Sequence, residues 1–228
     1  MTLSSKTIPP RPPARLYLAT PAIDDPQALV QALPSLLAEA DIAAVLLRLK
    51  PSDPRTLTSR IKALAPIIQD AGAALLLDGN VDLVARGGAD GAHLSGIAAL
   101  EEALPALRPD RIAGVSGLAT RHDSMTAGEL GVDYVMFGEP DESGQRPSAA
   151  AIAERLQWWD ELFEIPSVGF AGTLEEVGAF AAAGADFILA ADFIWNAPEG
   201  PAAALRAATE AIRKAHAAMS AKAEASQG

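Results

Sequence analysis

Residues 73–96, AALLLDGNVDLVARGGADGAHLSG, contain the pattern that decides the fold. Residues 73–77 form an apolar run that ends in the turn residues 78–80, which indicates a strand followed by a loop. Residues 81–86 can form two helical turns before a Gly-Gly pair, and residues 89–94 are a second apolar strand. Two short strands joined by so short a helical crossover form a compact βαβ unit, whose strands pair in parallel.

The same alternation of apolar runs and helical patterns continues along the whole chain. Strands are predicted at residues 15–20, 42–50, 73–77, 89–94, 111–116, 132–138, 165–171 and 185–190. Helices are predicted at residues 24–40, 52–70 with the capping signal included, 81–86, 97–107, 121–130, 148–163, 173–183 and 201–221. Continuous apolar strands are typical of parallel sheets that are buried on both faces. Eight strand–helix units predict an α/β fold, a single (β/α)₈ TIM barrel, rather than an open sheet.

The barrel is predicted to span residues 15–221. Residues 1–14 contain four prolines and no apolar segment of the kind found in signal peptides, so they predict a disordered Pro-rich tail. Residues 222–228 predict a disordered C-terminus. Within the barrel, the triplet GAD occurs at 88–90 and 184–186, with the related GVD at 131–133, and each is interpreted as a glycine helix cap before a strand.

The net charge of −11 and the absence of cysteine exclude several classes of function. A strongly acidic chain is repelled by phosphate backbones, so we expect no nucleic-acid partner, although a local basic pocket could still hold one small anion. Without cysteine there are no disulfides and no thiolate chemistry. No apolar run reaches the roughly 18 residues of a transmembrane helix, so we expect no membrane partner and a cytoplasmic protein.

Two cations close the strand at 42–50. In a barrel, the carboxyl ends of the strands face the active site, and alternate residues of a strand point the same way, so Arg48 and Lys50 are expected to project together. Arg can bind a phosphate bidentately and Lys adds a point charge, which makes the pair a candidate anion site. The alternative is a pair of solvated charges that bridge to Asp53 or Asp78.

Three further residues follow or interrupt strands. Gly172 and Thr173 lie where strand 165–171 passes into a helix, and backbone N–H groups at such a helix start bind phosphate in many barrels. Equally, Gly172 could simply form the turn. His93 lies within a strand, where a histidine is either a hydrogen-bonded core or rim residue or an acid–base catalyst.

An aromatic stretch lies near the end of the helix predicted at 148–163. Trp159 and Phe163 are spaced i, i+4, which places them on one helical face beside Trp158. This stretch either packs on the barrel wall or forms a contact in a homo-oligomer.

The order of these elements resembles the thiamine-phosphate synthase family, which includes thiazole tautomerases. The strongest match is LLDGNVDLVARGGADGAHLSG, residues 76–96, to the family's N-D-R-V-D-L-A…G-A-D-G-V-H-L-G-Q. The other matching segments are LYLAT (16–20), LLRLK (46–50, family Q-x-R-x-K), GVS (114–116, family G-V-S-x-H), GVDYVMFG (131–138), GFAGT (169–173) and GADFILAADFI (184–194). The resemblance covers residues 15 to about 212 and implies the barrel fold.

The resemblance also implies an activity. The family joins a pyrimidine pyrophosphate to a thiazole phosphate, and Mg²⁺ and cationic side chains hold the departing pyrophosphate. Arg48 and Lys50 match two of those cations, and Ser116 matches a serine near the pyrophosphate.

This sequence departs from the family pattern at its charged positions. The family glutamine is Leu46 here, and the two Mg²⁺ carboxylate positions hold Gly79 and Ala98. The serine beside the thiazole phosphate is Asp192, which would repel phosphate, and the tautomerase histidine is Leu118. The family's T-x-T-K loop becomes the acidic residues 139–147, EPDESGQRP, in which Arg146 could replace the lysine.

We therefore predict a diverged family member, linked to thiamine biosynthesis, whose transferase activity is altered or lost and which binds a small phosphorylated heterocycle. Mg²⁺ is implied by the resemblance only, and neither a metal ligand nor a catalytic residue is assigned. Two alternatives stay open. One is a non-catalytic binding or regulatory barrel for a small phosphate ligand, and the other is an enzyme of different specificity that uses Asp78, His93 or Asp192 as acid–base groups.

Overall fold

The computed structural model of the chain describes residues 11–141 and 143–225. Eight strands close into a barrel in sequence order, and every pairing is parallel, including the closing pair of the first and last strands. The strands are β1 (Arg15–Ala19), β2 (Ile42–Leu47), β3 (Ala74–Asp78), β4 (Gly91–Ser95), β5 (Ile112–Ser116), β6 (Tyr134–Phe137), β7 (Ser167–Ala171) and β8 (Phe187–Ala190). The prediction of a single (β/α)₈ barrel is confirmed.

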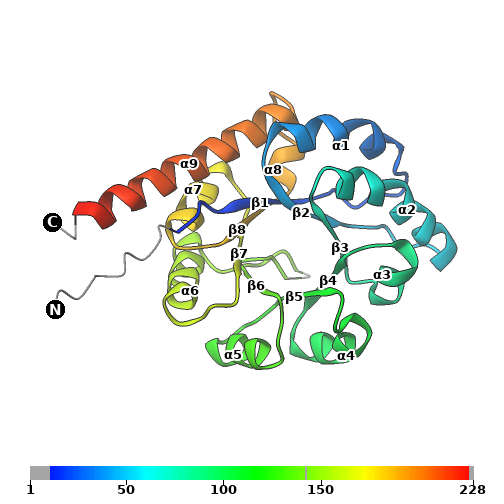
Figure 1. The fold of residues 1–228 in the computed structure, drawn as a ribbon, viewed down its shortest axis with the longest axis horizontal. Helices are drawn as coiled ribbons and strands as arrows, with labels where there is room; N and C mark the ends of the chain where they lie inside the picture. The colour runs from blue at the N-terminus through cyan, green and yellow to red at the C-terminus, as the bar shows by residue number, and fades with distance from the viewer. Residues whose placement is uncertain (1–10, 142, 226–228) are drawn as a thin grey trace, which may run out of the picture.

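The helices lie outside the ring of strands (Figure 1). They are α1 (Gln27–Glu39), α2 (Pro54–Asp70), α3 (Val81–Gly87), α4 (Ile97–Leu107), α5 (Arg121–Glu129), α6 (Ala149–Leu162), α7 (Leu174–Ala182), α8 (Asp192–Trp195) and α9 (Pro201–Ala225). The short α8 was not predicted, because a single turn leaves no periodic pattern. The closing helix α9 packs on α7 and continues past the predicted end at residue 221. None of the helices in the described part of the chain combines the length and the apolar character needed to cross a membrane.

Residues 1–10 of the predicted N-terminal tail and 226–228 of the predicted C-terminal tail lie outside the described residues, whereas residues 222–225 are the last residues of α9. Arg11 contacts α6 and the segment before β8. The Arg11 guanidinium donates to the carbonyl of Gly184 at 2.6 Å and to the carboxylate of Asp186 at 2.7 Å, and it also pairs with Asp160.

Two apolar layers hold the barrel together. The outer faces of the strands pack against the helices in one continuous core. A second cluster fills the barrel interior, and it takes alternate residues from the strands, as the pleat of a strand requires. Its members include Tyr17, Leu46, Leu76, Tyr134, Met136, Val168, Phe170 and Leu189. Because β4 and β5 contribute smaller or polar residues inward, this interior leaves room for hydrogen-bonded groups below the mouth of the barrel.

The aspartates of the three Gly-x-Asp triplets tie each strand to the one before it. The side chain of Asp90 accepts from the backbone N–H of Leu75 at 2.7 Å. Asp133 and Asp186 accept in the same way from Ala113 and Ser167, each at 2.8 Å. The triplets are therefore structural, as predicted, and the aspartates contribute a strand-to-strand bond that the pattern did not reveal.

Trp159 of the aromatic stretch at the end of α6 is buried, while Trp158 and Phe163 are partly exposed. Trp159 is 1% exposed and stacks on Phe163, with ring centroids 4.1 Å apart, while its indole N–H donates to the carbonyl of Ile165 at 2.7 Å. These contacts favour packing on the barrel wall. A homo-oligomer stays a prediction.

Candidate functional site

The carboxylate of Glu139 lies at the centre of the barrel mouth, in the loop after β6. Its Oε2 atom accepts a hydrogen bond from the hydroxyl of Ser116 at 2.5 Å and lies 3.1 Å from Nε2 of His93. Its Oε1 atom accepts from the guanidinium of Arg48 at 3.4 Å. The residue after β2, the middle of β4 and the end of β5 therefore direct one cation, one imidazole and one hydroxyl at a single side chain that is 17% exposed.

This environment keeps Glu139 ionised. Burial alone would raise the pKa of its carboxyl. The hydrogen bond and charge of His93, the hydroxyl of Ser116 and the charge of Arg48 outweigh burial and lower the pKa to about 2. Glu139 is therefore a permanent anion at neutral pH, held by donors that point into the mouth.

A buried hydrogen-bond chain supports Glu139 from below. Nδ1 of His93 lies 2.9 Å from the hydroxyl of Tyr134, which lies 3.1 Å from the hydroxyl of Tyr17. Burial raises the pKa of both tyrosines, so the phenols stay protonated. Tyr134 fits because its ring crosses Gly114, where a Cβ atom would lie 1.9 Å from the ring. His93 is 2% exposed and both ring nitrogens have partners, so it positions Glu139 and is closed off from a ligand in the mouth.

Arg48 and Lys50, predicted to act together, have different surroundings. Arg48 lies between two carboxylates, Asp78 at 3.4 Å from Nε and Glu139 at 3.4 Å from Nη2, and is 21% exposed. Burial raises the pKa of Asp78. Lys50 is exposed beyond the end of β2. Asp53 instead caps α2. The pairing with Asp78 matches the structural alternative for Arg48, and an anion-binding role for Arg48 or Lys50 stays a prediction.

The predicted anion site between β7 and α7 already contains a carboxylate. Oε2 of Glu176 accepts from the backbone N–H of Gly172 at 2.6 Å and from Nη1 of Arg146 at 3.1 Å. A second Arg146 nitrogen donates to the carbonyl of Phe170 at 3.0 Å. Thr173 caps α7 through its side chain, which accepts from the Glu176 N–H. The structure therefore brings Gly172 and Arg146 together, around a partner that the sequence analysis did not consider.

Asp192 is the first residue of α8 and is exposed. The structure gives its side chain no hydrogen bond or ion pair with another described residue. It is therefore not part of the network around Glu139.

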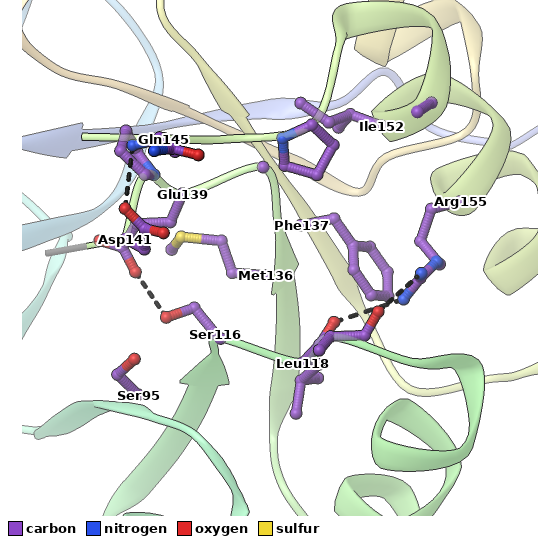
Figure 2. A pocket seen from close by; sticks show the side chains of 16 residues that line it. Ser95, Ser116, Leu118, Met136, Phe137, Glu139, Asp141, Gln145, Ile152 and Arg155 are labelled. Carbon is purple, nitrogen blue, oxygen red and sulfur yellow. Dashed lines mark hydrogen bonds between the residues drawn. The ribbon is translucent and has the colours of Figure 1, made fainter. Parts of the chain in front are cut away.

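A cavity of about 350 Å³ opens between the loops that follow β5 and β6, beside Glu139 (Figure 2). Leu118, Met136, Phe137 and Ile152 form its apolar walls. Its polar lining comes from Ser95, Ser116, Glu139, Asp141, Gln145 and Arg155. The volume is at the lower end of the range for small-molecule sites.

Arg155 is the functional candidate that the sequence analysis missed. It lies in the middle of α6, outside any motif, and its guanidinium lies 5.7 Å from the ring centre of Phe137. It donates to the carbonyls of Leu118 and Ala119 at 3.4 and 3.3 Å. Arg155 lies three residues after Ile152, on the same helical face, and both line the cavity. This spacing is the one sequence signal for Arg155, and many surface arginines share it.

The described residues do not fit the Mg²⁺ site that the resemblance implies. Asp78 faces Arg48, Gly79 has no side chain, and the short side chain of Ala98 has no oxygen donor. No three His, Asp or Glu side chains among residues 11–141 and 143–225 are arranged to hold a metal ion. The arrangement is instead suited to binding a small ligand beside a fixed carboxylate.

Comparisons with known proteins agree with the architecture. A protein-family model described as thiamine monophosphate synthase matches residues 16–194 of this chain. The thiamine-phosphate synthase of Rhodospirillum centenum is 40% identical over 194 residues, which cover 84% of this chain and 94% of that protein. The thiamine-phosphate synthase of Hyphomonas neptunium is 36% identical over 210 residues, covering 88% and 95%.

A solved structure extends this similarity to the fold. The thiamine phosphate pyrophosphorylase from Pyrococcus furiosus superposes with a TM-score of 0.71 at 21% identity, covering 88% of this chain and 96% of that chain. At this identity the likeness supports the barrel alone.

Proposed function

The chain belongs to the thiamine monophosphate synthase family, and from this we propose that it is a diverged member which binds one small phosphorylated heterocycle of thiamine biosynthesis. We propose further that it does not carry out the family's ordinary Mg²⁺-dependent joining of two precursors. The cavity beside Glu139 suits the binding of a small ligand. The charges around Glu139 do not suit the departure of pyrophosphate.

The position of the Glu139 carboxylate is the observation that carries the proposal. By the family resemblance, Arg48 and Ser116 would contact the pyrophosphate. Here both donate to Glu139 instead, at 3.4 and 2.5 Å. A pyrophosphate at this position would meet a fixed negative charge, and the Coulomb repulsion between two such charges at 4 Å is about 4 kcal/mol near a protein surface. The donors that should neutralise the leaving group are thus already neutralised.

The poor fit of the described residues to a Mg²⁺ ion supports the same proposal. Departure of pyrophosphate needs its developing charge to be stabilised by groups aimed at the leaving oxygens. A Mg²⁺ ion can supply this when one or two carboxylates and the substrate hold it. Asp78 is the carboxylate of the matching turn 78–80, and it already pairs with Arg48.

Binding without joining remains feasible, because the cavity beside Glu139 has apolar walls and polar ends. A thermal-shift panel tests this part of the proposal. It compares thiazole phosphate, pyrimidine pyrophosphate, thiamine phosphate and inorganic phosphate, each with and without Mg²⁺. We expect stabilisation by one phosphorylated heterocycle that does not depend on Mg²⁺. No stabilisation by any heterocycle at millimolar concentration would contradict the binding role, and rapid Mg²⁺-dependent product formation would contradict the loss of joining activity.

A further inference from the structure

Arg155 differs from Arg48 and Arg146, two other arginines at the carboxyl end of the barrel, in the groups that contact its guanidinium. Arg48 faces the carboxylates of Asp78 and Glu139, and Arg146 faces that of Glu176. Arg155 has no carboxylate within ion-pair distance among the described residues, and its two hydrogen bonds to backbone carbonyls are long, 3.4 and 3.3 Å. Its half-buried guanidinium therefore keeps most of its capacity to pair with an anion.

The cavity places this charge opposite the acidic groups. Figure 2 shows Arg155 reaching from α6 past Phe137 toward the Leu118 loop, while Glu139 and Asp141 lie on the other side of the view. Phe137, Met136 and Leu118 line the space between the two ends. A ligand with one anionic group is thus attracted at one end and repelled at the other, which fixes its orientation.

We propose that this cavity is the ligand site, and that Arg155 binds the anionic group of a flat heterocycle of one or two rings. The ring lies against Phe137 and Met136, between Arg155 at one end of the cavity and Glu139 at the other. Arginine suits this role because its planar guanidinium can donate two parallel hydrogen bonds to a phosphate or carboxylate. The choice of a phosphate as the anion rests on the proposed function, whereas the cavity and the position of Arg155 do not.

The test is a calorimetric titration of the full chain with two probes, the phosphate ester of hydroxyethylmethylthiazole and the same alcohol without phosphate. Arg155→Gln removes the charge, and Arg155→Lys keeps a charge without the planar fork. Arg121→Gln is the matched control, because Arg121 carries the same charge on the neighbouring helix, is 53% exposed, and does not line the cavity. Inorganic phosphate and a thiazole carboxylate, titrated separately, distinguish a phosphate from a carboxylate ligand.

The expected result is that Arg155→Gln weakens binding of the thiazole phosphate by about tenfold or more, the size of a charge-assisted hydrogen bond. Arg155→Lys should weaken it less, Arg121→Gln by less than about twofold, and the alcohol should be insensitive to all three substitutions. If Arg155→Gln does not fold, the Nε–H resonance of Arg155 in the wild-type chain gives the same answer, because it must shift on titration with thiazole phosphate.

Two results overturn the inference. One is binding of thiazole phosphate that Arg155→Gln leaves unchanged, which would place the anion elsewhere while the proposed function survives. The other is the absence of binding by every anionic probe. Binding of inorganic phosphate or the carboxylate that depends on Arg155, with no binding of thiazole phosphate, would support this site and overturn the proposed thiamine ligand.

Discussion

Glu139 and His93 are 46 residues apart in the sequence, yet Oε2 of the first lies 3.1 Å from Nε2 of the second at the mouth of the barrel. The imidazole is fixed from the other side by Tyr134, so its orientation is set before any ligand arrives. A positioned imidazole, a hydroxyl and a guanidinium would normally form a good anion site. In this chain the anion is a side chain.

The first prediction is that Glu139→Gln destabilises the fold. The amide is neutral and has one acceptor oxygen instead of two, so it cannot accept both from Arg48 and from the Ser116 and His93 side. Breaking a mostly buried charge network by losing one charged partner is costly. We expect the free energy of unfolding at pH 7 to fall by about 2–4 kcal/mol, as measured by urea denaturation.

Asp78→Asn is the control for this prediction. Asp78 also lies 3.4 Å from the Arg48 guanidinium, but its side chain is 42% exposed and burial raises the pKa of its carboxyl, so its charged form gains little. Asp78→Asn should change the free energy of unfolding by no more than about 1 kcal/mol, as for an exposed ion pair. Equal losses of unfolding free energy in Glu139→Gln and Asp78→Asn would contradict the claim that Glu139 holds the network together.

A second prediction concerns acid stability. The pKa of Glu139 is lowered from 4.5 to about 2 in the folded chain. Between these values the unfolded chain binds more protons, so the stabilisation is fully present above pH 4.5 and is lost as the pH falls toward 2. Its full size is on the order of 3 kcal/mol.

Urea denaturation at pH values from 7 to 3 measures this effect. The wild-type chain should lose more stability over that interval than Glu139→Gln, so the two curves should converge on acidification. The charge of Glu139 also contributes to the raised pKa of Asp78, so the difference between the curves reports Glu139 together with its effect on Asp78. Parallel curves would show that the carboxylate has an ordinary pKa.

The third prediction is that Glu176→Ala creates an anion site between β7 and α7. The substitution frees the Gly172 N–H and the Arg146 guanidinium, which both donate to Oε2 of Glu176. Two freed donors, one of them charged, should raise the affinity for inorganic phosphate by about tenfold. Phosphorus NMR titration measures the gain.

Glu175→Ala is the matched control, because Glu175 lies in the same first turn of α7 and is exposed. It removes the same negative charge from the same helix end without freeing the two donors. A gain in phosphate affinity in both variants would indicate a general electrostatic effect instead of a specific site.

The sequence predicted the fold well, because every strand of this barrel is an apolar run between recognisable turns. The bounds of β1 and of β3 to β8 differ from the expected ones by one or two residues, and the strand expected at 42–50 ends earlier, at Leu47. The missing element was α8, a single turn.

The site was less predictable. The acidic loop after β6 was recognised as a departure from the family, but its Glu139 meets residues that lie 23, 46 and 91 positions earlier. Side-chain direction at a strand end depends on closure of the barrel, which no local pattern specifies. Arg155 was missed for a different reason. A single arginine in a helix usually lies on a solvated face, and nothing in the local sequence shows that this one lines a cavity.

The last prediction is that the chain does not carry out ordinary Mg²⁺-dependent synthesis of thiamine phosphate. Three stabilisers of the departing pyrophosphate are altered together. Arg48 and Ser116 donate to Glu139, and the described residues form no Mg²⁺ site. Losing one such stabiliser typically lowers the rate by about 10²–10³. Turnover with both precursors and Mg²⁺ should therefore stay near background, as measured by product formation in a chromatographic assay that includes an active synthase as positive control.

The assay should include Asp78→Ala and Glu139→Gln beside the wild-type chain. If Asp78 held a metal during turnover, its loss would abolish any activity, whereas we expect the background rate to be the same in the wild type and in Asp78→Ala. Glu139→Gln should also stay near background, because removing the competing carboxylate does not supply the missing metal ligands. Mg²⁺-dependent turnover on the order of 1 s⁻¹, the low end of ordinary enzyme rates, that disappears in Asp78→Ala would show that Asp78 exchanges Arg48 for a metal ion when substrate binds.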